Sequence, residues 1–152
     1  MSCALMLACL AAQGVTMTQP SDALLDAICM VESHGKARAY NAKTKAAGAF
    51  QITPGALAQV NKTYRTRFSV ADCYDKHVGR NIARLYLTYL ARQYERQTGN
   101  RPGQQELARF YNGGLGGWQG IGPGLYWRKV AAAMTAKVAR KAYRKSRRKG
   151  VA

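Results

Sequence analysis

The chain has 152 residues and a mass of 16.7 kDa, enough for one domain with a single hydrophobic core. Hydrophobic residues make up 47% of it and prolines number only four, which argues against a wholly disordered or fibrous chain. No stretch approaches the roughly 18 consecutive apolar residues that a membrane-spanning helix needs. The net charge of +17 is unusually high and predicts an anionic partner.

The chain begins with an apolar segment, MSCALMLACLAAQG. It resembles the apolar part of a secretion signal but lacks the basic start, because no Lys or Arg occurs before Lys36. We therefore expect residues 1–19 to form a short apolar helix packed on the domain or on a partner. Export by a standard signal is the alternative.

Helical periodicity dominates the sequence after residue 19. The first helix begins behind Ser21 as its N-cap and ends at Gly35. Residues 36–52 show no helical stripe and predict a loop or a small hairpin. Thr53 and Pro54 then form a helix start, with Pro at the first helical position behind a Thr cap.

The second half predicts three more helices. The longest runs over about 75–98 with Gly99 as its stop, and a shorter one over about 102–111. The glycine-rich segment 113–124 predicts a loop that carries Trp118, and a last helix follows from about Leu125. The apolar stripe of that helix is Trp127, Val130, Met134 and Val138. The fold class predicted by this pattern is mainly α.

The four cysteines are too few and too scattered for a disulfide framework. Cys29 precedes His34 and Cys73 precedes His77, a pairing that imitates a Cys2His2 zinc site. Zinc modules space their ligands more regularly, so we expect packed or exposed thiols, no metal and no cofactor.

Glu32 is the first candidate catalytic residue. It shares a helix face with Leu25 and Cys29, so its carboxyl group points toward the core near the C-terminus of the helix. Burial and the negative end of the helix dipole both disfavour the anion, so we expect a raised pKa. A carboxyl group that stays protonated near neutral pH is what a general acid requires. Taken from the helix alone, a half-exposed structural glutamate is the simpler interpretation.

Four short motifs follow one another in the chain: Glu32-Ser33, residues 48–54 (GAFQITP), Asn81-Ile82 with Tyr86-Leu87, and residues 111–114 (YNGG). In this order they resemble the SLT-type lytic transglycosylase family, bacterial and phage wall-cleaving enzymes of lysozyme-like fold that are related to goose-type lysozyme. The resemblance covers about residues 20–127. It implies a lysozyme-like domain over 20–127, followed by a basic helical tail over 128–152.

The resemblance also implies roles for individual residues. Glu32 matches the catalytic acid and base of the family, and Ser33 is the residue beside it. Gly48 and Gln51 match the loop that lines the sugar cleft, while Tyr111 and Asn112 match the pair that closes the site. Ala49-Phe50 and Phe110 depart from the family pattern, each by an apolar-for-apolar change.

Two tryptophans and three of the matched residues have structural alternatives. Trp118 is interpreted as a sugar platform in the cleft and Trp127 as core. The alternative for Gln51 is a loop residue that bonds its own backbone, that for Tyr111 is a core residue with a satisfied hydroxyl, and that for Asn112 with Gly113 is a helix end.

Counting acids gives an argument that does not depend on the resemblance. A glycosidase with two carboxylates needs a second Asp or Glu across the bond, yet no acidic residue lies between Ser33 and Ala71. A mechanism with a single acid fits better. In the family, the glutamate protonates the leaving oxygen, and the N-acetyl group and 6-hydroxyl of the sugar complete the reaction to leave a 1,6-anhydro end.

Residues 126–152 contain ten basic and no acidic residues, more than half of the excess positive charge. This tail is interpreted as a solvated helix face, as an arm that binds DNA or a membrane, or as a docking helix for a larger assembly. We therefore expect two partners, peptidoglycan glycan strands and, through residues 128–152, other virion proteins or DNA.

The combined prediction is a peptidoglycan lytic transglycosylase that cleaves the MurNAc–GlcNAc β-1,4 bond and is carried in a phage virion, where it opens the wall locally. An exported periplasmic protein is the alternative location. Two other functions stay open: a basic structural or nucleic-acid-binding virion protein on a decayed lysozyme-like scaffold, and a hydrolytic lysozyme.

Overall fold

The computed structural model describes the backbone of residues 19–149 and the side chains of residues 19–141. In this part of the chain the α-helices are α1 (Asp22–Ser33), α2 (Pro54–Tyr64), α3 (Lys76–Thr98), α4 (Gln104–Gly117) and α5 (Ile121–Lys149). Two short antiparallel strands, β1 (Tyr40–Asn41) and β2 (Ala46–Ala47), follow α1, and a 3₁₀ helix, η1 (Ala71–Tyr74), precedes α3. The chain is mainly helical, as the sequence predicts. Apart from Gln19, the apolar N-terminal segment lies outside the described residues.

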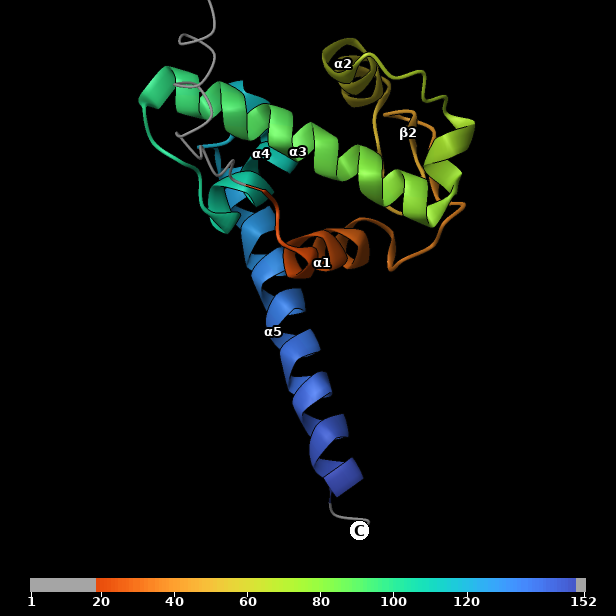
Figure 1. Cartoon of the computed structure of the whole chain (residues 1–152), viewed down its shortest axis with the longest axis vertical. Coiled ribbons are helices and arrows are strands. Elements are labelled where there is room, and N and C mark those ends of the chain that lie inside the picture. Colours follow the sequence, from red (N-terminus) through yellow and green to blue (C-terminus); the bar gives the residue numbers. More distant parts are fainter. Residues whose placement is uncertain (1–18, 150–152) are drawn as a thin grey trace, which may run out of the picture.

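Figure 1 shows α3 extending across one side of the molecule, with α2 and the strand pair near one of its ends. Helix α1 lies on the other side of the domain, and α5 passes it and projects well beyond the other helices. Helix α5 packs on α4 and α1, while α3 packs on α2, α4 and η1. None of the described helices is long and apolar enough to cross a membrane.

Local sequence signals set most helix ends. Ser21, Thr53 and Asp75 cap α1, α2 and α3 by accepting hydrogen bonds from backbone N–H groups of the first turn. Pro54 takes the first position of α2, where a backbone N–H would have no partner within the helix, so the missing N–H of proline costs no hydrogen bond. Gly99 ends α3 in the left-handed conformation. Each of these boundaries confirms the corresponding prediction.

One hydrophobic core joins all five helices. Phe50 and Phe110 are its largest fully buried side chains. Around them pack buried aliphatic residues of every helix: Leu24, Leu25, Ile28, Val60, Ile82, Leu87, Leu107 and Val130. Since Val130 belongs to α5, the first turns of that helix are part of the domain.

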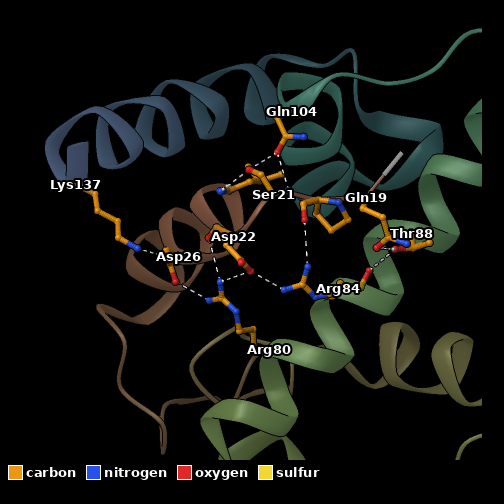
Figure 2. A network of polar contacts seen from close by, with 11 residues as sticks. Gln19, Ser21, Asp22, Asp26, Arg80, Arg84, Thr88, Gln104 and Lys137 are labelled. Carbon is orange, nitrogen blue, oxygen red and sulfur yellow. Dashed lines mark hydrogen bonds and ion pairs between the residues drawn. The ribbon is translucent and has the colours of Figure 1, made fainter. Parts of the chain in front are cut away.

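A polar network fastens α1 to three other helices (Figure 2). Asp22 and Asp26 of α1 pair with Arg80 and Arg84 of α3, and Lys137 of α5 reaches Asp26. On the neighbouring side, the cap residue of α1 donates a hydrogen bond to the first residue of α4. The position of α1 is therefore set by polar contacts in addition to its buried face.

The predicted loop over residues 113–124 is wrong. Helix α4 continues to Gly117 through a kink at Gly114 (φ 61°, ψ −175°), and α5 already begins at Ile121. A Cβ atom on Gly113 would lie 2.5 Å from the ring of Pro123. The glycine therefore allows the ends of α4 and α5 to pack closely, and this packing overrides the low helix propensity of the segment.

The apolar stripe predicted for the last helix is only partly buried. Val130 is fully buried and Met134 packs against the core, but Val138 is 67% exposed. The buried face therefore does not extend to Val138. The far part of α5 projects away from the other helices (Figure 1). Residue 127 lies within this one continuous helix.

Candidate active site

Glu32 lies in the last turn of α1, where residue 34 ends the helix in the left-handed conformation. Its carboxyl group is largely buried against the domain, and this burial raises the pKa of Glu32 above the ordinary value of 4.5. A hydrogen bond from Tyr126 acts in the opposite direction but does not cancel the effect. The predicted upward shift is therefore present, and its main cause is desolvation.

Tyr126 of α5 holds the carboxyl group in place. Its hydroxyl group donates a hydrogen bond of 2.7 Å to Oε1 of Glu32. The phenol is 7% exposed, and burial together with the nearby carboxylate raises the pKa of Tyr126 far above the physiological range. Tyr126 thus remains a hydrogen-bond donor, and Oε2 of Glu32 is left to carry an exchangeable proton.

Sequence reasoning missed Tyr126. The predicted stripe of the last helix ran through Trp127, whereas the buried face of α5 begins with Pro123, Tyr126 and Val130. These three residues have the 3–4 spacing of a helix face, so the signal was present in the sequence. It was missed because the helix was expected to begin only at residue 125.

A tight turn over residues 48–51 faces α1. It is closed by two backbone hydrogen bonds between Ala47 and Ile52, of 3.0 and 2.9 Å. Gly48 has φ +81°, and a Cβ atom there would lie 1.8 Å from the carbonyl oxygen of Cys73. Gln51 also has a positive φ of 48°, which is uncommon for a residue with a side chain. The matched glycine is therefore required by the backbone and by the close approach of η1.

Two of the matched residues fasten this turn to the helices. The hydroxyl group of Ser33 donates a hydrogen bond of 2.8 Å to the carbonyl oxygen of Ala49. The hydroxyl group of Tyr111, on α4, donates one of 2.6 Å to the carbonyl oxygen of Phe50. Ser33 is only 7% exposed, so the structure gives it an anchoring position beside Glu32.

Tyr111 also lies within electrostatic reach of Glu32. Burial raises the pKa of Tyr111 well above its ordinary value, and the negative charge of Glu32 is the next largest cause. The ring of Tyr86 packs edge-on against Tyr111, with 6.3 Å between the ring centroids. The structure therefore brings together Glu32, Tyr111 and Tyr126, which come from α1, α4 and α5.

The other matched residues lie around this group in different ways. Gln51 is half-buried, and its side-chain amide donates a hydrogen bond of 3.1 Å to the carbonyl oxygen of Gly48. This contact matches the alternative interpretation of Gln51, a loop residue that bonds the backbone of its own turn. Asn112 is exposed next to Tyr111, so its side chain is accessible to a ligand.

Trp118 belongs to an aromatic cluster at the end of α4. Its ring contacts Tyr94 and Phe110 edge-on, with centroid distances of 5.8 and 5.3 Å, and Arg109 lies over it. These contacts favour a packing role over a sugar platform. Trp127 is half-buried and packs against the core, in agreement with its prediction.

Glu32 is the one carboxyl group in this arrangement. All 7 Asp and Glu residues of the chain lie in its described part. Ion pairs hold Asp22, Asp26 and Glu95, and hydrogen bonds from nearby N–H or O–H groups hold Asp72, Asp75 and Glu106. Each of the six other carboxylates therefore has a structural contact away from Glu32.

The cysteine–histidine pairs do not form a metal centre in residues 19–141. Cys29 and Cys73 are buried free thiols, and burial raises the pKa of both. His34 and His77 are exposed. No group of three or more His, Cys, Asp and Glu side chains gathers within these residues.

Replacing Tyr126 with Phe should raise the pKa of Glu32 further. The hydrogen bond from Tyr126 stabilises the ionised carboxylate, so its loss favours the protonated form. Carboxyl-selective NMR titration of the protein measures this change. Tyr64→Phe is the matched control, because the Tyr64 hydroxyl bonds a backbone carbonyl of α3. An unchanged titration of Glu32 in the Tyr126→Phe variant would contradict the contact.

Comparison with known proteins identifies the family. A family model described as the transglycosylase SLT domain matches residues 10–120, which is well over half of the chain. No significant match was found among curated proteins or solved structures. The match includes α1, the turn over residues 48–51 and α4, but ends before Tyr126. The chain belongs to the SLT transglycosylase family, the lytic transglycosylases that act as lyases on peptidoglycan.

Proposed function

We propose that the enzyme cleaves the β-1,4 bond between MurNAc and GlcNAc and leaves a 1,6-anhydro end on the muramic acid. The observation that supports this product is the isolation of Glu32. It is a largely buried carboxyl group with a raised pKa, and the other carboxylates have structural contacts elsewhere. A hydrolase with two carboxylates would need a second one across the bond to activate water or form a glycosyl intermediate.

In this mechanism Glu32 acts twice. Protonated Glu32 first donates its proton to the glycosidic oxygen, and the bond between that oxygen and C1 of MurNAc breaks. The 6-hydroxyl group of the same sugar then bonds to C1 and gives its proton to the Glu32 carboxylate, which restores the enzyme. The internal hydroxyl group has a high effective concentration, so it competes well with water.

Tyr126 and Tyr111 prepare Glu32 for these steps. Tyr126 binds Oε1 through the reaction and stabilises the carboxylate after the proton has left. Tyr111 keeps the turn over residues 48–51 against the site through its bond to Phe50. Neither phenol ionises in the working range, because burial raises the pKa of both.

Mass spectrometry of digested peptidoglycan tests the proposed product. We expect muropeptides that are lighter by one water than the products of hydrolysis, because the 6-hydroxyl group takes the place of the water. A lysozyme digest of the same wall is the control for hydrated products. Fully hydrated products would show that the enzyme is a hydrolase, and Asp72 or Asp75 would then be the first candidate for the missing base.

We further propose that the enzyme is carried in a phage virion and opens the wall locally at the start of infection. The support for this location is the far half of α5, which projects from the domain and carries basic residues (Figure 1). Of its described side chains, Lys137, Arg140 and Lys141 are exposed, and so is the apolar Val138. A helix of this kind suits attachment to DNA or to an anionic surface of a neighbouring virion protein.

Removing residues 142–152 should weaken DNA binding and reduce its salt dependence. This truncation deletes five basic residues and spares Val130 and Met134, whose packing a cut at residue 129 would destroy. Each lost phosphate contact lowers the slope of log K against log salt by about one. This slope is measured from the binding of duplex DNA at several salt concentrations, for the full chain and for the truncated one.

The control carries Lys62→Gln, Arg65→Gln and Arg67→Gln, at and after the exposed end of α2. If the truncated enzyme binds DNA with the same salt dependence as the full chain, DNA is not the partner of α5.

A further inference from the structure

A cavity lies on α1 outside the group of residues around Glu32. It is a cavity of about 600 Å³ between α1, the start of α3 and the middle of α5, and Glu32 is not one of its lining residues. Its apolar wall is formed by Ala27, Cys29, Met30, Phe50, Ala133 and Ala136. A volume of this size is within the range of small-ligand sites.

The polar wall of the cavity is strongly basic. Four cations, Lys76, Arg80, Lys137 and Arg140, line it together with a single carboxylate, Asp26. Asp26 is already engaged by Arg80 and Lys137 (Figure 2). His77 is the remaining titratable group at the wall besides the Cys29 thiol.

Two of these cations have no ion-pair partner among the side chains of residues 19–141. In the described part of the chain, neither Lys76 nor Arg140 takes part in an ion pair. They come from different helices, α3 and α5, and both are exposed at the cavity. Together with Arg80 and Lys137 they create an excess of positive charge that an anionic ligand would neutralise.

The cavity is built from the same elements as the site of Glu32. Cys29 and Met30 lie in the turn of α1 that precedes Glu32, and Ala133 lies two turns after Tyr126 on α5. Phe50 belongs to both places, since it lines the cavity and its carbonyl oxygen accepts the hydrogen bond of Tyr111. The cavity and the site of Glu32 therefore share α1, α5 and Phe50 as neighbouring parts of the fold.

We propose that this cavity binds the carboxylate-bearing stem peptide of peptidoglycan, which rests on the proposed cleavage beside muramic acid. In the glycan strand the lactyl carboxyl group of muramic acid is amide-linked to the peptide, so the free carboxylates belong to the peptide. The peptide also carries alanine methyl groups that match the apolar wall. Lys76 and Arg140 bind the carboxylates, and the site thereby favours strands that still carry peptides.

The test compares two substrates: glycan strands with intact stem peptides and the same strands stripped of peptides by an amidase. For Lys76→Gln/Arg140→Gln, we expect the ratio of kcat/KM on peptide-bearing to stripped strands to fall at least about tenfold, as expected for losing charge-assisted contacts. The matched control is Lys62→Gln/Arg65→Gln, which removes two cations at the end of α2 and should keep the ratio. An unchanged ratio in the cavity variant would overturn the proposal.

A binding measurement separates this inference from the proposed reaction. Calorimetry with a soluble stem peptide that has free carboxylates should show binding to the full chain and its loss in Lys76→Gln/Arg140→Gln. If the parent protein cuts neither substrate but binds the peptide in this way, the proposed reaction fails and the cavity assignment stands. If the parent protein cuts both substrates equally well and does not bind the peptide, the cavity assignment fails alone.

Discussion

Glu32→Gln should lower the rate of peptidoglycan cleavage by about 10²–10⁴-fold, the usual contribution of a general acid and base. Glutamine keeps the shape of the side chain, and its amide oxygen can still accept the hydrogen bond from Tyr126. It has no proton to transfer to the glycosidic oxygen and no carboxylate to take one back. Release of soluble muropeptides from purified wall material measures the loss.

The melting temperature of Glu32→Gln, measured as a function of pH, shows whether this variant is folded. The pKa of Glu32 is higher in the folded protein than its ordinary value of 4.5, so the folded state binds the proton more tightly than the unfolded chain. The parent protein therefore loses stability as the pH rises above about 4.5. The glutamine variant lacks this loss, so its melting temperature should exceed that of the parent at neutral pH and approach it near pH 4.

Asp72→Asn is the matched control for activity. Asp72 accepts hydrogen bonds from Ser69 in front of η1, and its pKa is lowered by them. Its loss removes a local contact but no proton donor at the site, so cleavage should continue near the parent rate. Full activity of Glu32→Gln, or an equal loss in both variants, would show that Glu32 is not the acid.

The helix ends were predictable because their causes are local. A cap residue such as Ser21 or Asp75 bonds backbone groups two or three positions away, so the sequence contains the whole interaction. The loop prediction for residues 113–124 was wrong because the cause of the structure there is not local. Whether Gly113 favours a loop or a close helix contact depends on Pro123, which faces it only in the folded chain.

In the candidate site, too, the features with local causes were predictable and the contacts between distant segments were not. The inward direction of Glu32 follows from the periodicity of α1, and burial raises its pKa as expected. The contacts of Ser33 and Tyr111 with the turn, and the bond from Tyr126, join segments that are 16, 61 and 94 residues apart. No local pattern encodes such pairs. The family resemblance identified Ser33 and Tyr111 as matched positions but left their contacts unspecified.

Gly48→Ala should destabilise the domain more strongly than any other glycine-to-alanine change in the described chain. Gly48 has φ +81°, and its new Cβ atom would lie 1.8 Å from a backbone carbonyl oxygen of η1. The backbone of the turn or of η1 must therefore move. Strain of a left-handed residue costs about 1–2 kcal/mol, and overpacking adds about 1–3 kcal/mol more.

Gly99→Ala separates these two costs. Gly99 has a similar φ of 71°, but a Cβ atom there would meet nothing within 4 Å. It should therefore lower the melting temperature only by the conformational cost, about 3–6 °C in a domain of this size. Gly48→Ala should lower it by roughly 10 °C or more, and thermal unfolding followed by circular dichroism compares the two.

The loss of stability at Gly48 should be accompanied by a loss of activity. Displacing the turn moves the carbonyl oxygens of Ala49 and Phe50, which accept the hydrogen bonds of Ser33 and Tyr111. Cleavage at 20 °C, where the variant is still folded, should then fall while Gly99→Ala retains the parent rate. If both variants unfold at the same temperature, the close approach to η1 is not what requires glycine at position 48.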